Sequence, residues 1–475
     1  MNQVARTFLL VGLVVVILFA MRFLPTIYLG DNELRQVNIL SDLLPETLSG
    51  TDSTEVLDIP EPPSVVASVP DSVLVYDSID GVDTVIPRMV QPQTTPDGVM
   101  MIADYGQGQP GGMHHFYQQL SHVKELNRPV RIAYFGDSFI EGDILSADLR
   151  EQLQTQFGGD GVGWVDCASP ICGFRQTVRH SFEGLREYEV VKRPFNTQVQ
   201  SIAQRYFIID GNKATFVYQG SKSRKHLSDW QKATFFFRTQ DSITIATKMN
   251  RDSLVYDVLC GDGQLQTFTK RHSSMRKIIY SVSAASPDTY LYGVALESNQ
   301  GVIVDNFSMR GSSGVSLGNI PSGVLREFAA QRPYDLIIFH FGLNVANENV
   351  RNYKPYIQQL GNVIRRFKAA YPQTSILIVS MTDRDQRSME GIHTMQGVES
   401  LVGYQQIMAA NQRVAFFNLF QAMGGRESMK TLVDKGLANK DYTHISHAGG
   451  RRLATHLVES ILAGFDIYKN SNSHE

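Results

Sequence analysis

The sequence predicts an α/β protein in which helices cover both faces of a parallel sheet and a β-sandwich is inserted into the chain. Strand-like apolar runs alternate with helix-like segments on either side of residues 176–300, and nearly continuous apolar strands separated by helices are typical of a buried parallel sheet. Within residues 176–300 the alternation stops, and short β-rich runs separated by turn residues follow one another. That spacing is typical of a β-sandwich.

Five apolar runs are the predicted strands of the parallel sheet, and five further segments are the predicted helices. The strands cover residues 130–135, 301–309, 335–342, 374–381 and 413–420. The helices cover residues 113–126, 147–157, 353–370, 400–412 and 448–465. Because the β-rich insertion enters and leaves between the first two strands, we expect it to overhang the carboxyl edge of the sheet, where ligands bind in open parallel sheets.

The 475 residues therefore divide into four predicted parts. These are a membrane anchor (1–29), a proline-rich acidic linker (30–110), a discontinuous α/β domain (111–175 and 301–470) and the inserted β-rich domain (176–300). In the insertion, Trp230, Phe235 and Phe237 fit either a sugar site or core packing. Alternating aromatic residues in a strand favour core packing.

The amino terminus predicts export and anchoring. An uncharged apolar run covers residues 7–21 after Arg6 and, apart from Arg22, continues to residue 29, which provides the roughly 20 residues that a membrane helix needs. We predict an uncleaved anchor, with cleavage after export as the alternative. Residues 30–98 hold thirteen Asp and Glu against two Arg, with eight prolines, a composition typical of an extended, solvated spacer.

Charge and cysteine content exclude several classes of partner and cofactor. A net charge of −3 and a pI near 6.5 provide no basic field, so nucleic acid is not an expected partner. The three cysteines form no Cys-x-x-Cys pair and the histidines do not cluster at metal spacings, so no metal site is expected. Cys167 and Cys172 could bridge a short loop in an oxidising compartment or stay reduced.

The first candidate site residue is Ser138, in the sequence Gly-Asp-Ser at the end of the first predicted strand. A serine at this place fits two interpretations: it is a nucleophile at the ligand-binding edge of the sheet, or it caps the following helix. Asp137 precedes it and is expected to support it.

Three further segments follow predicted strands or precede a helix, in chain order. Gly314 lies in RGSSG, and Asn344 lies in FGLN; a backbone N–H and a side-chain amide are donors that can stabilise an oxyanion. Asp441 and His444 lie three residues apart in DYTH, a spacing that lets the carboxylate hold Nδ1–H while Nε2 faces a serine. His447 is the alternative base, although it fits a helix start better.

This order of motifs resembles the SGNH subgroup of the GDSL esterase and lipase family. The resemblance implies a flavodoxin-like three-layer α/β/α sheet, a Ser138–His444–Asp441 triad, and an oxyanion hole formed by Ser138, Gly314 and Asn344. The serine mechanism that the resemblance implies needs no cofactor. The chain departs from the family pattern in having no leucine after GDSF, no aspartate after GLN and no proline after the histidine of DYTHIS, which argues against lipase-like substrates.

A narrower resemblance joins the GDS and EGD motifs, the following FGGDGVGWV and the β-rich insertion. The chain is similar to bacterial exported peptidoglycan O-acetylesterases, whose inserted module resembles carbohydrate-binding domains. It implies an esterase for O-acetylated envelope glycan, attached to the periplasmic side of the inner membrane. Residues 394–406 and 416–425 also resemble SGNH proteins that accompany membrane-bound O-acyltransferases, so one alternative is an O-acetyltransferase that uses the same residues, with such a partner. The other is a non-catalytic glycan-binding protein that uses the β-rich insertion.

Overall fold

The computed structural model describes residues 93–472, except 107, 285 and 390, together with four two-residue strands: β1 (Tyr28–Leu29), β2 (Asn32–Glu33), β3 (Tyr76–Asp77) and β4 (Ile86–Pro87). Apart from these strands, the predicted anchor (1–29) and the predicted linker up to residue 92 lie outside the described residues. Among the helices that are described, none is both long and apolar enough to cross a membrane.

A six-stranded sheet forms the centre of the α/β domain. Its order is β18 (Val302–Ser308), β6 (Val130–Gly136), β19 (Leu336–His340), β20 (Ser375–Val379), β23 (Ala415–Phe417) and β5 (Ala103–Asp104). The first five strands are parallel, and β5 pairs antiparallel with β23. All five predicted strands are confirmed, although β23 is shorter than predicted because α7 (Leu419–Ala422) begins two residues after it.

The β5 strand corrects the predicted end of the linker at residue 110. The Asp104 side chain accepts hydrogen bonds from the backbone N–H groups of Gly106 and Met113, both at 2.9 Å. Together with the pairing of β5 with β23, these contacts show that residues 103–104 already belong to the folded body. A two-residue strand has no periodicity of its own, and its pairing with β23 is a tertiary contact.

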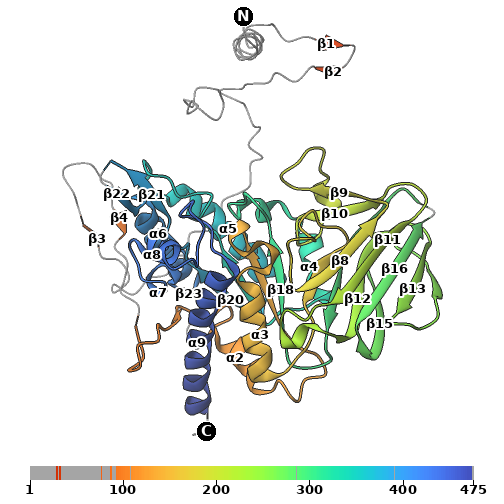
Figure 1. The fold of residues 1–475 in the computed structure, drawn as a ribbon, viewed down its shortest axis with the longest axis horizontal. Coiled ribbons are helices and arrows are strands. Elements are labelled where there is room, and N and C mark those ends of the chain that lie inside the picture. Colours follow the sequence, from red (N-terminus) through yellow and green to blue (C-terminus); the bar gives the residue numbers. More distant parts are fainter. Residues whose placement is uncertain are drawn as a thin grey trace, which may run out of the picture. The chain divides into compact units, whose positions relative to one another are not determined.

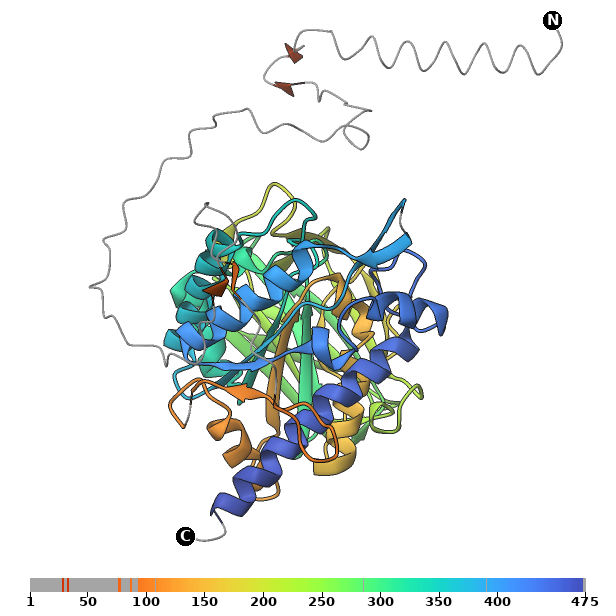
Figure 2. The ribbon, with the colours of Figure 1, turned by 90° about the vertical axis from the view of Figure 1, so that its left-hand side faces the viewer.

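Helices cover both faces of the parallel sheet. Alternate residues of each strand point to opposite faces, and in β6 the residues on both faces are buried. In β6, Ala133 and Phe135 pack with α4 (Ser322–Gln331), α5 (Lys354–Ala370) and α6 (Gly397–Gln412). Ile132 and Tyr134 pack with α2 (His114–Ser121), α3 (Ser146–Phe157), α8 (Ser428–Asp434) and α9 (His447–Asn472). Figure 2 shows α9 crossing this face beside α2 and α3. The predicted α/β class is confirmed, and α4, α7 and α8 add to the five predicted helices.

Two antiparallel sheets form the insertion between β6 and β18, on the side of the molecule where β18 is the sheet edge (Figure 1). The first sheet contains β15 (Leu265–Met275), β12 (Trp230–Thr239), β17 (Thr289–Glu297), β10 (Arg205–Ile209) and β9 (Leu185–Glu189), and β7 (Gly163–Asp166) also pairs with β17. The second contains β14 (Val255–Leu259), β13 (Ile243–Met249), β16 (Lys277–Ala284), β11 (Ala214–Gly220) and β8 (Val178–Glu183). The two sheets enclose a shared apolar core, as predicted for a sandwich.

The sandwich begins earlier in the chain than the predicted boundary at residue 176. β7 already belongs to it. Gly161 lies two residues before this strand with a φ of 99°, and Gly163 begins the strand with a φ of 76°. A β-carbon on Gly163 would lie 2.3 Å from a carboxylate oxygen of Asp305 in β18, so the glycine allows β7 to pass close to the parallel sheet. The short apolar run of β7 is too ambiguous to place from sequence alone.

The aromatic residues of β12 are core residues. Trp230, Phe235 and Phe237 are buried between the two sheets, which confirms core packing over a sugar site at these positions. Phe236, between the last two, points the opposite way and packs against Trp164 and Phe328 of the core next to the parallel sheet. The central part of β12 is therefore buried on both faces of the sheet.

A buried ion cluster joins the insertion to the parallel sheet. Glu297 of β17 is 1% exposed and contacts Arg131 of β6 at 2.8 Å, Arg332 at 3.0 Å and Lys232 at 2.6 Å. Burial by itself would raise the pKa of Glu297, but Arg131, Arg332 and Lys232 hold this pKa well below its ordinary value. Arg332 also pairs with Asp305 of β18 at 2.5 Å. These contacts bind the insertion and the sheet together.

Candidate active site

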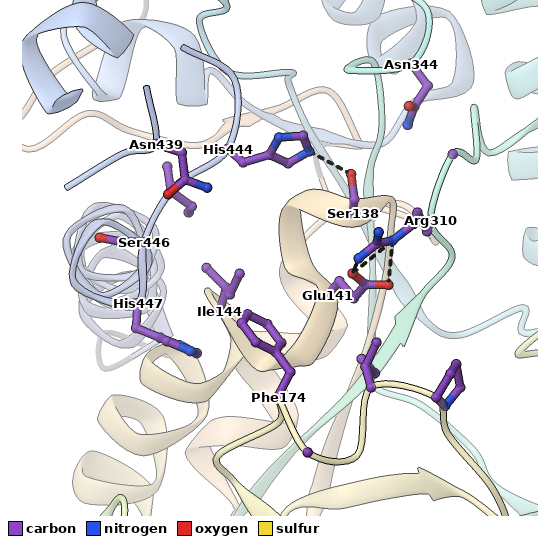
Figure 3. A pocket seen from close by; sticks show the side chains of 15 residues that line it. Ser138, Glu141, Ile144, Phe174, Arg310, Asn344, Asn439, His444, Ser446 and His447 are labelled. Carbon is purple, nitrogen blue, oxygen red and sulfur yellow. Dashed lines mark hydrogen bonds and ion pairs between the residues drawn. The ribbon is translucent and has the colours of Figure 1, made fainter. Parts of the chain in front are cut away.

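The strand order places β6 at the switch point of the sheet. The chain passes from β6 to β18 on one side and then to β19, β20 and β23 on the other, and ligands of open α/β sheets bind at the carboxyl ends of the strands beside such a point. A pocket of about 830 Å³ lies there (Figure 3). Its lining includes three predicted site residues, Ser138, Asn344 and His444.

Ser138 begins the 3₁₀ turn η3 (Ser138–Asp143), directly after β6. The capping role at this turn belongs to its neighbour, because the Asp137 side chain accepts the Phe139 N–H at 2.9 Å. Ser138 is half-buried, and its Oγ lies 3.2 Å from Nε2 of His444. Of the two interpretations of Ser138, the geometry supports the nucleophile.

His444 and Asp441 form a hydrogen-bonded pair within one loop. Nδ1 of His444 lies 2.8 Å from Oδ2 of Asp441, and the backbone N–H groups of His444 and Thr443 donate to Oδ1, both at 3.0 Å. Burial by itself would raise the pKa of Asp441, but these hydrogen bonds from His444 and Thr443 lower it. The ionised carboxylate thus holds the histidine ring with Nε2 facing Ser138.

Asp137 lies buried behind the serine, at 2% exposure. Burial raises the pKa of Asp137 to about 6. Four weaker effects act in the opposite direction: the hydrogen bond from the Phe139 backbone, the charge of His444, and the hydrogen bonds from the Leu343 backbone and the Asn344 side chain. This side chain therefore links the turn that carries Ser138 to the loop that carries Asn344.

The three predicted oxyanion donors differ in their placement. Asn344 lines the pocket, and its Nδ2 donates to the Ser312 carbonyl at 3.1 Å. Gly314 is buried, and its N–H donates to the Ser312 hydroxyl at 3.0 Å. Gly311, three residues earlier, lines the pocket instead. The N–H of Ser138 lies in the first turn of η3, where backbone donors lack a partner within the helix. The oxyanion role of Gly314 stays a prediction.

A side chain at Gly314 would disturb the packing between the loops that follow β18 and β19. The φ of Gly314 is 85°, and a β-carbon there would lie 2.6 Å from the ring of Phe341. The glycine in RGSSG is therefore required for close packing of the loops after β18 and β19, whichever group binds the oxyanion.

Asp143 is a buried anchor of the site for which the sequence indicated no role. The backbone of Asp143 has a φ of 65°. Its carboxylate contacts four side chains: Arg175 at 2.9 Å, Thr177 at 2.5 Å, Asn306 at 2.9 Å and Arg150 at 3.4 Å. Burial would raise the pKa of Asp143, but Arg175 and Arg150 lower it strongly. The signal in the sequence is its place in EGD, five residues after Ser138 in the same turn.

A second support joins the loops that carry Asn344 and His444. Nη1 of Arg384 donates to the Leu343 carbonyl at 3.2 Å, and the N–H of Asp385 donates to the Tyr442 carbonyl at 3.1 Å. Both residues follow β20. They act through the backbone of two distant segments, so no motif in the sequence indicates them.

His447 lines the same pocket but does not contact Ser138 in the manner of a base. Its ring stacks on Phe174, with centroids 5.5 Å apart and an interplanar angle of 29°. Burial, followed by the charge of Arg224, lowers the pKa of His447. The charges of Asp148 and Asp143 raise this pKa, but by less. The structure thus favours His444 over His447 as the base.

The variant His447→Ala is expected to stay within a few-fold of the parent protein in kcat/KM for a small acetyl ester, because Ser138 already pairs with His444. The measurement is the release of p-nitrophenol from p-nitrophenyl acetate by purified variants. Loss of nearly all turnover in this variant, with His444→Ala still active, would move the base to residue 447.

Within the part of the chain that the structure describes, no group of three or more His, Cys, Asp or Glu side chains is arranged to hold a metal ion. Cys167 is buried, Cys172 is half-buried, and both are free thiols.

The fold and the site together define a doubly wound α/β protein with a serine, histidine and aspartate in hydrogen-bonded series at its switch point. The chain is similar to a solved peptidoglycan O-acetylesterase, with a TM-score of 0.62 and 20% identity, over 77% of this chain and 99% of that one. The expected resemblance to such an esterase with a β-rich insertion is confirmed at the level of the fold.

Two family two carbohydrate esterases also match with lower scores. The one from Cellvibrio japonicus has a TM-score of 0.24 and 11% identity, over 60% of this chain and 99% of that one. The one from Clostridium thermocellum, an active-site mutant, has a TM-score of 0.25 and 10% identity, over 54% and 93%. No model of a protein family matches the chain, and no curated relative does.

Proposed function

We propose that this protein is a serine esterase that removes O-acetyl groups from a cell-envelope polysaccharide, with peptidoglycan as the first candidate. The observation that carries the proposal is the hydrogen-bonded series Ser138, His444 and Asp441 at a pocket on the switch point of the sheet. The fold shared with a peptidoglycan O-acetylesterase supports the choice of substrate.

The proposed reaction proceeds through an acyl-enzyme. Oγ of Ser138 attacks the ester carbonyl carbon while Nε2 of His444 takes the hydroxyl proton, and Asp441 stabilises the imidazolium that forms. The ester C–O bond then breaks, and His444 returns the proton to the sugar oxygen. A water molecule, deprotonated by His444, attacks the acyl-serine and releases acetate and free Ser138.

The developing oxyanion needs donors on the pocket wall. The N–H of Ser138 and the amide of Asn344 are the candidates that border the pocket, and Gly314 is the third predicted donor. Loss of one such donor costs about 10²- to 10³-fold in kcat in other acyl-transfer enzymes. The Asn344 amide already donates to the Ser312 carbonyl and hydrogen-bonds the Asp137 carboxylate, so substrate binding would have to release one of these two contacts before the amide can donate to the oxyanion.

Exposure of the site favours hydrolysis over transfer. The side chains of His444 and Asp441 are 40% and 48% exposed, so water reaches the base, whereas a transferase must keep water from its acyl-enzyme. The alternative, an O-acetyltransferase with the same residues and a membrane-bound O-acyltransferase as partner, predicts acetyl transfer to an added acceptor sugar.

The decisive test is acetate release by the full chain from O-acetylated peptidoglycan and from O-acetylated xylan, with Ser138→Ala as the control. We expect acetate from peptidoglycan without any added acceptor, and none with the control variant. Acetate released equally by the control variant, or acetyl groups that appear only on an acceptor sugar, would contradict the proposed hydrolysis. Faster acetate release from xylan would support the proposed esterase activity but would make xylan, and not peptidoglycan, the preferred substrate.

We also propose that the protein acts in the cell envelope, on the periplasmic side of the inner membrane. The support is the apolar run at residues 7–21 and the acidic, proline-rich segment after it. Fractionation of cells that produce the full chain, with a protease applied from the periplasmic side, tests this location.

A further inference from the structure

Phe174 is a large apolar side chain left half open inside the candidate active site. It is 49% exposed and lines the same pocket as Ser138 (Figure 3). It lies on the segment between β7 and β8, which belong to the two different sheets of the sandwich. The inserted domain therefore contributes an aromatic ring to the catalytic pocket.

The ring has a defined position. A β-carbon on Gly142 would lie 2.6 Å from Cδ1 of Phe174, so the ring packs directly on the backbone of the turn that carries Ser138. His447 stacks on it at 5.5 Å. The next residue, Arg175, is fixed by its 2.9 Å contact with the buried Asp143. The ring thus has two packing neighbours and lies on an anchored segment, and a side chain placed in this way loses little conformational entropy when a ligand binds.

The surroundings of the ring are mixed in character. Ile144, Pro170 and Ile171 continue the apolar surface, whereas Arg310, Asn439 and Ser446 bring polar groups to the same pocket. Arg310 pairs with Glu141 beside Ser138, and its own side chain is 73% exposed. A pyranose ring has an apolar C–H face and a rim of hydroxyl groups, so it matches this lining better than an alkyl chain does, which would leave the polar groups without partners.

We propose that Phe174 is the stacking platform for the pyranose ring that carries the acetyl ester, and that it makes the site selective for saccharide esters. This inference rests on the proposed esterase function and specifies its substrate-binding residue. Aromatic faces bury large areas at low entropic cost, and binding energy from the sugar would be used to place the ester carbonyl against Ser138.

The test compares Phe174→Leu, Phe174→Ala and Phe174→Trp in the full chain. Leucine keeps apolar volume without a ring face, and tryptophan keeps the face. Phe182→Leu is the matched control, because Phe182 is 38% exposed on β8 and does not line the pocket. For an O-acetylated chito-oligosaccharide we expect the leucine and alanine variants to raise KM about tenfold, equivalent to about 1.4 kcal/mol. Tryptophan and the control should keep the parent value.

A second measurement stays informative whatever the enzyme does to this saccharide. The deacetylated oligosaccharide should inhibit hydrolysis of p-nitrophenyl acetate competitively, with Ki about tenfold higher in Phe174→Leu and unchanged in Phe182→Leu. Without inhibitor, the kcat/KM for p-nitrophenyl acetate should be unchanged in Phe182→Leu, and in Phe174→Leu it should fall by less than the kcat/KM for the saccharide. Thermal unfolding of each variant checks that the fold is retained.

Several results would overturn the platform. An unchanged Ki and KM in Phe174→Leu would mean that the ring face is not used, and equal losses on the saccharide and on p-nitrophenyl acetate would mean that Phe174 only shapes the catalytic turn. Dependence on Phe174 that grows with acyl chain length in p-nitrophenyl esters would assign the ring to an acyl chain. Failure of the proposed function itself looks different: Ser138→Ala would then keep full turnover of p-nitrophenyl acetate.

Discussion

Replacing either Ser138 or His444 by alanine is expected to remove nearly all turnover of an acetyl ester, by roughly 10⁴- to 10⁶-fold in kcat. The reason is that Oγ of Ser138 and Nε2 of His444, 3.2 Å apart, perform one step together: the bond to the acyl carbon forms as the proton leaves. Single-turnover and steady-state hydrolysis of p-nitrophenyl acetate are the measurements.

The double variant distinguishes a catalytic unit from two independent effects. Ser138→Ala combined with His444→Ala should lose little more than either single change, because once one member is gone the other has no partner to act on. Asp441→Asn should retain the packing of the loop and still lose about 10²- to 10⁴-fold, because an amide holds the wrong histidine tautomer and no longer balances the imidazolium. Losses that multiply in the double variant would show that the assignment is wrong.

Glu297→Gln is expected to destabilise the protein by about 3 to 5 kcal/mol. Glutamine has nearly the same shape, but it leaves Arg131, Arg332 and Lys232 close together and largely buried without the charge that compensates them. Urea unfolding at pH 7 measures the change. Asp210→Asn is the control: its partner Arg186 is 56% exposed and Asp210 54%, and pairs of that kind contribute at most about 1 kcal/mol.

The difference between the parent protein and Glu297→Gln should depend on pH in one direction. The folded pKa of Glu297 lies well below its ordinary 4.5, so its stabilisation is fully present above pH 4.5 and is lost as the pH falls toward the folded pKa. Unfolding curves at falling pH should therefore converge from about pH 4.5 downward. A constant difference over that range, or a glutamine variant as stable as the parent at pH 7, would contradict the role of the buried charge.

The two clusters around Glu297 and Asp143 suggest why the insertion belongs to the site. The first joins the sandwich to β6, and the second joins the segment before β8 to the turn that carries Ser138. Both are buried. The expected overhang of the insertion agrees with this arrangement, since four residues of the segment between β7 and β8 line the pocket: Pro170, Ile171, Gly173 and Phe174.

The sequence by itself determined the class of the fold and the order of its strands along the chain. The five apolar runs and the five longer helical segments have lengths and periods that depend on local side-chain alternation, which is readable without knowledge of distant contacts. It also determined Ser138, Asp441 and His444 as candidates, because a serine at a strand end and an Asp–His pair three residues apart are local patterns.

Tertiary structure alone decided the features that depend on residues far apart in the chain. The start of the sandwich at β7 depends on pairing with β17, some 130 residues later, and β5 depends on β23. The supports at Asp143, Arg384 and Asp385 act on backbone or charges from other elements. The choice between nucleophile and cap at Ser138 belongs to the same group, because it depended on Asp137 occupying the cap and on a histidine 306 residues away reaching the hydroxyl. Such contacts leave no periodicity in the sequence, since their energy comes from burial and charge pairing that exist only after the chain has folded.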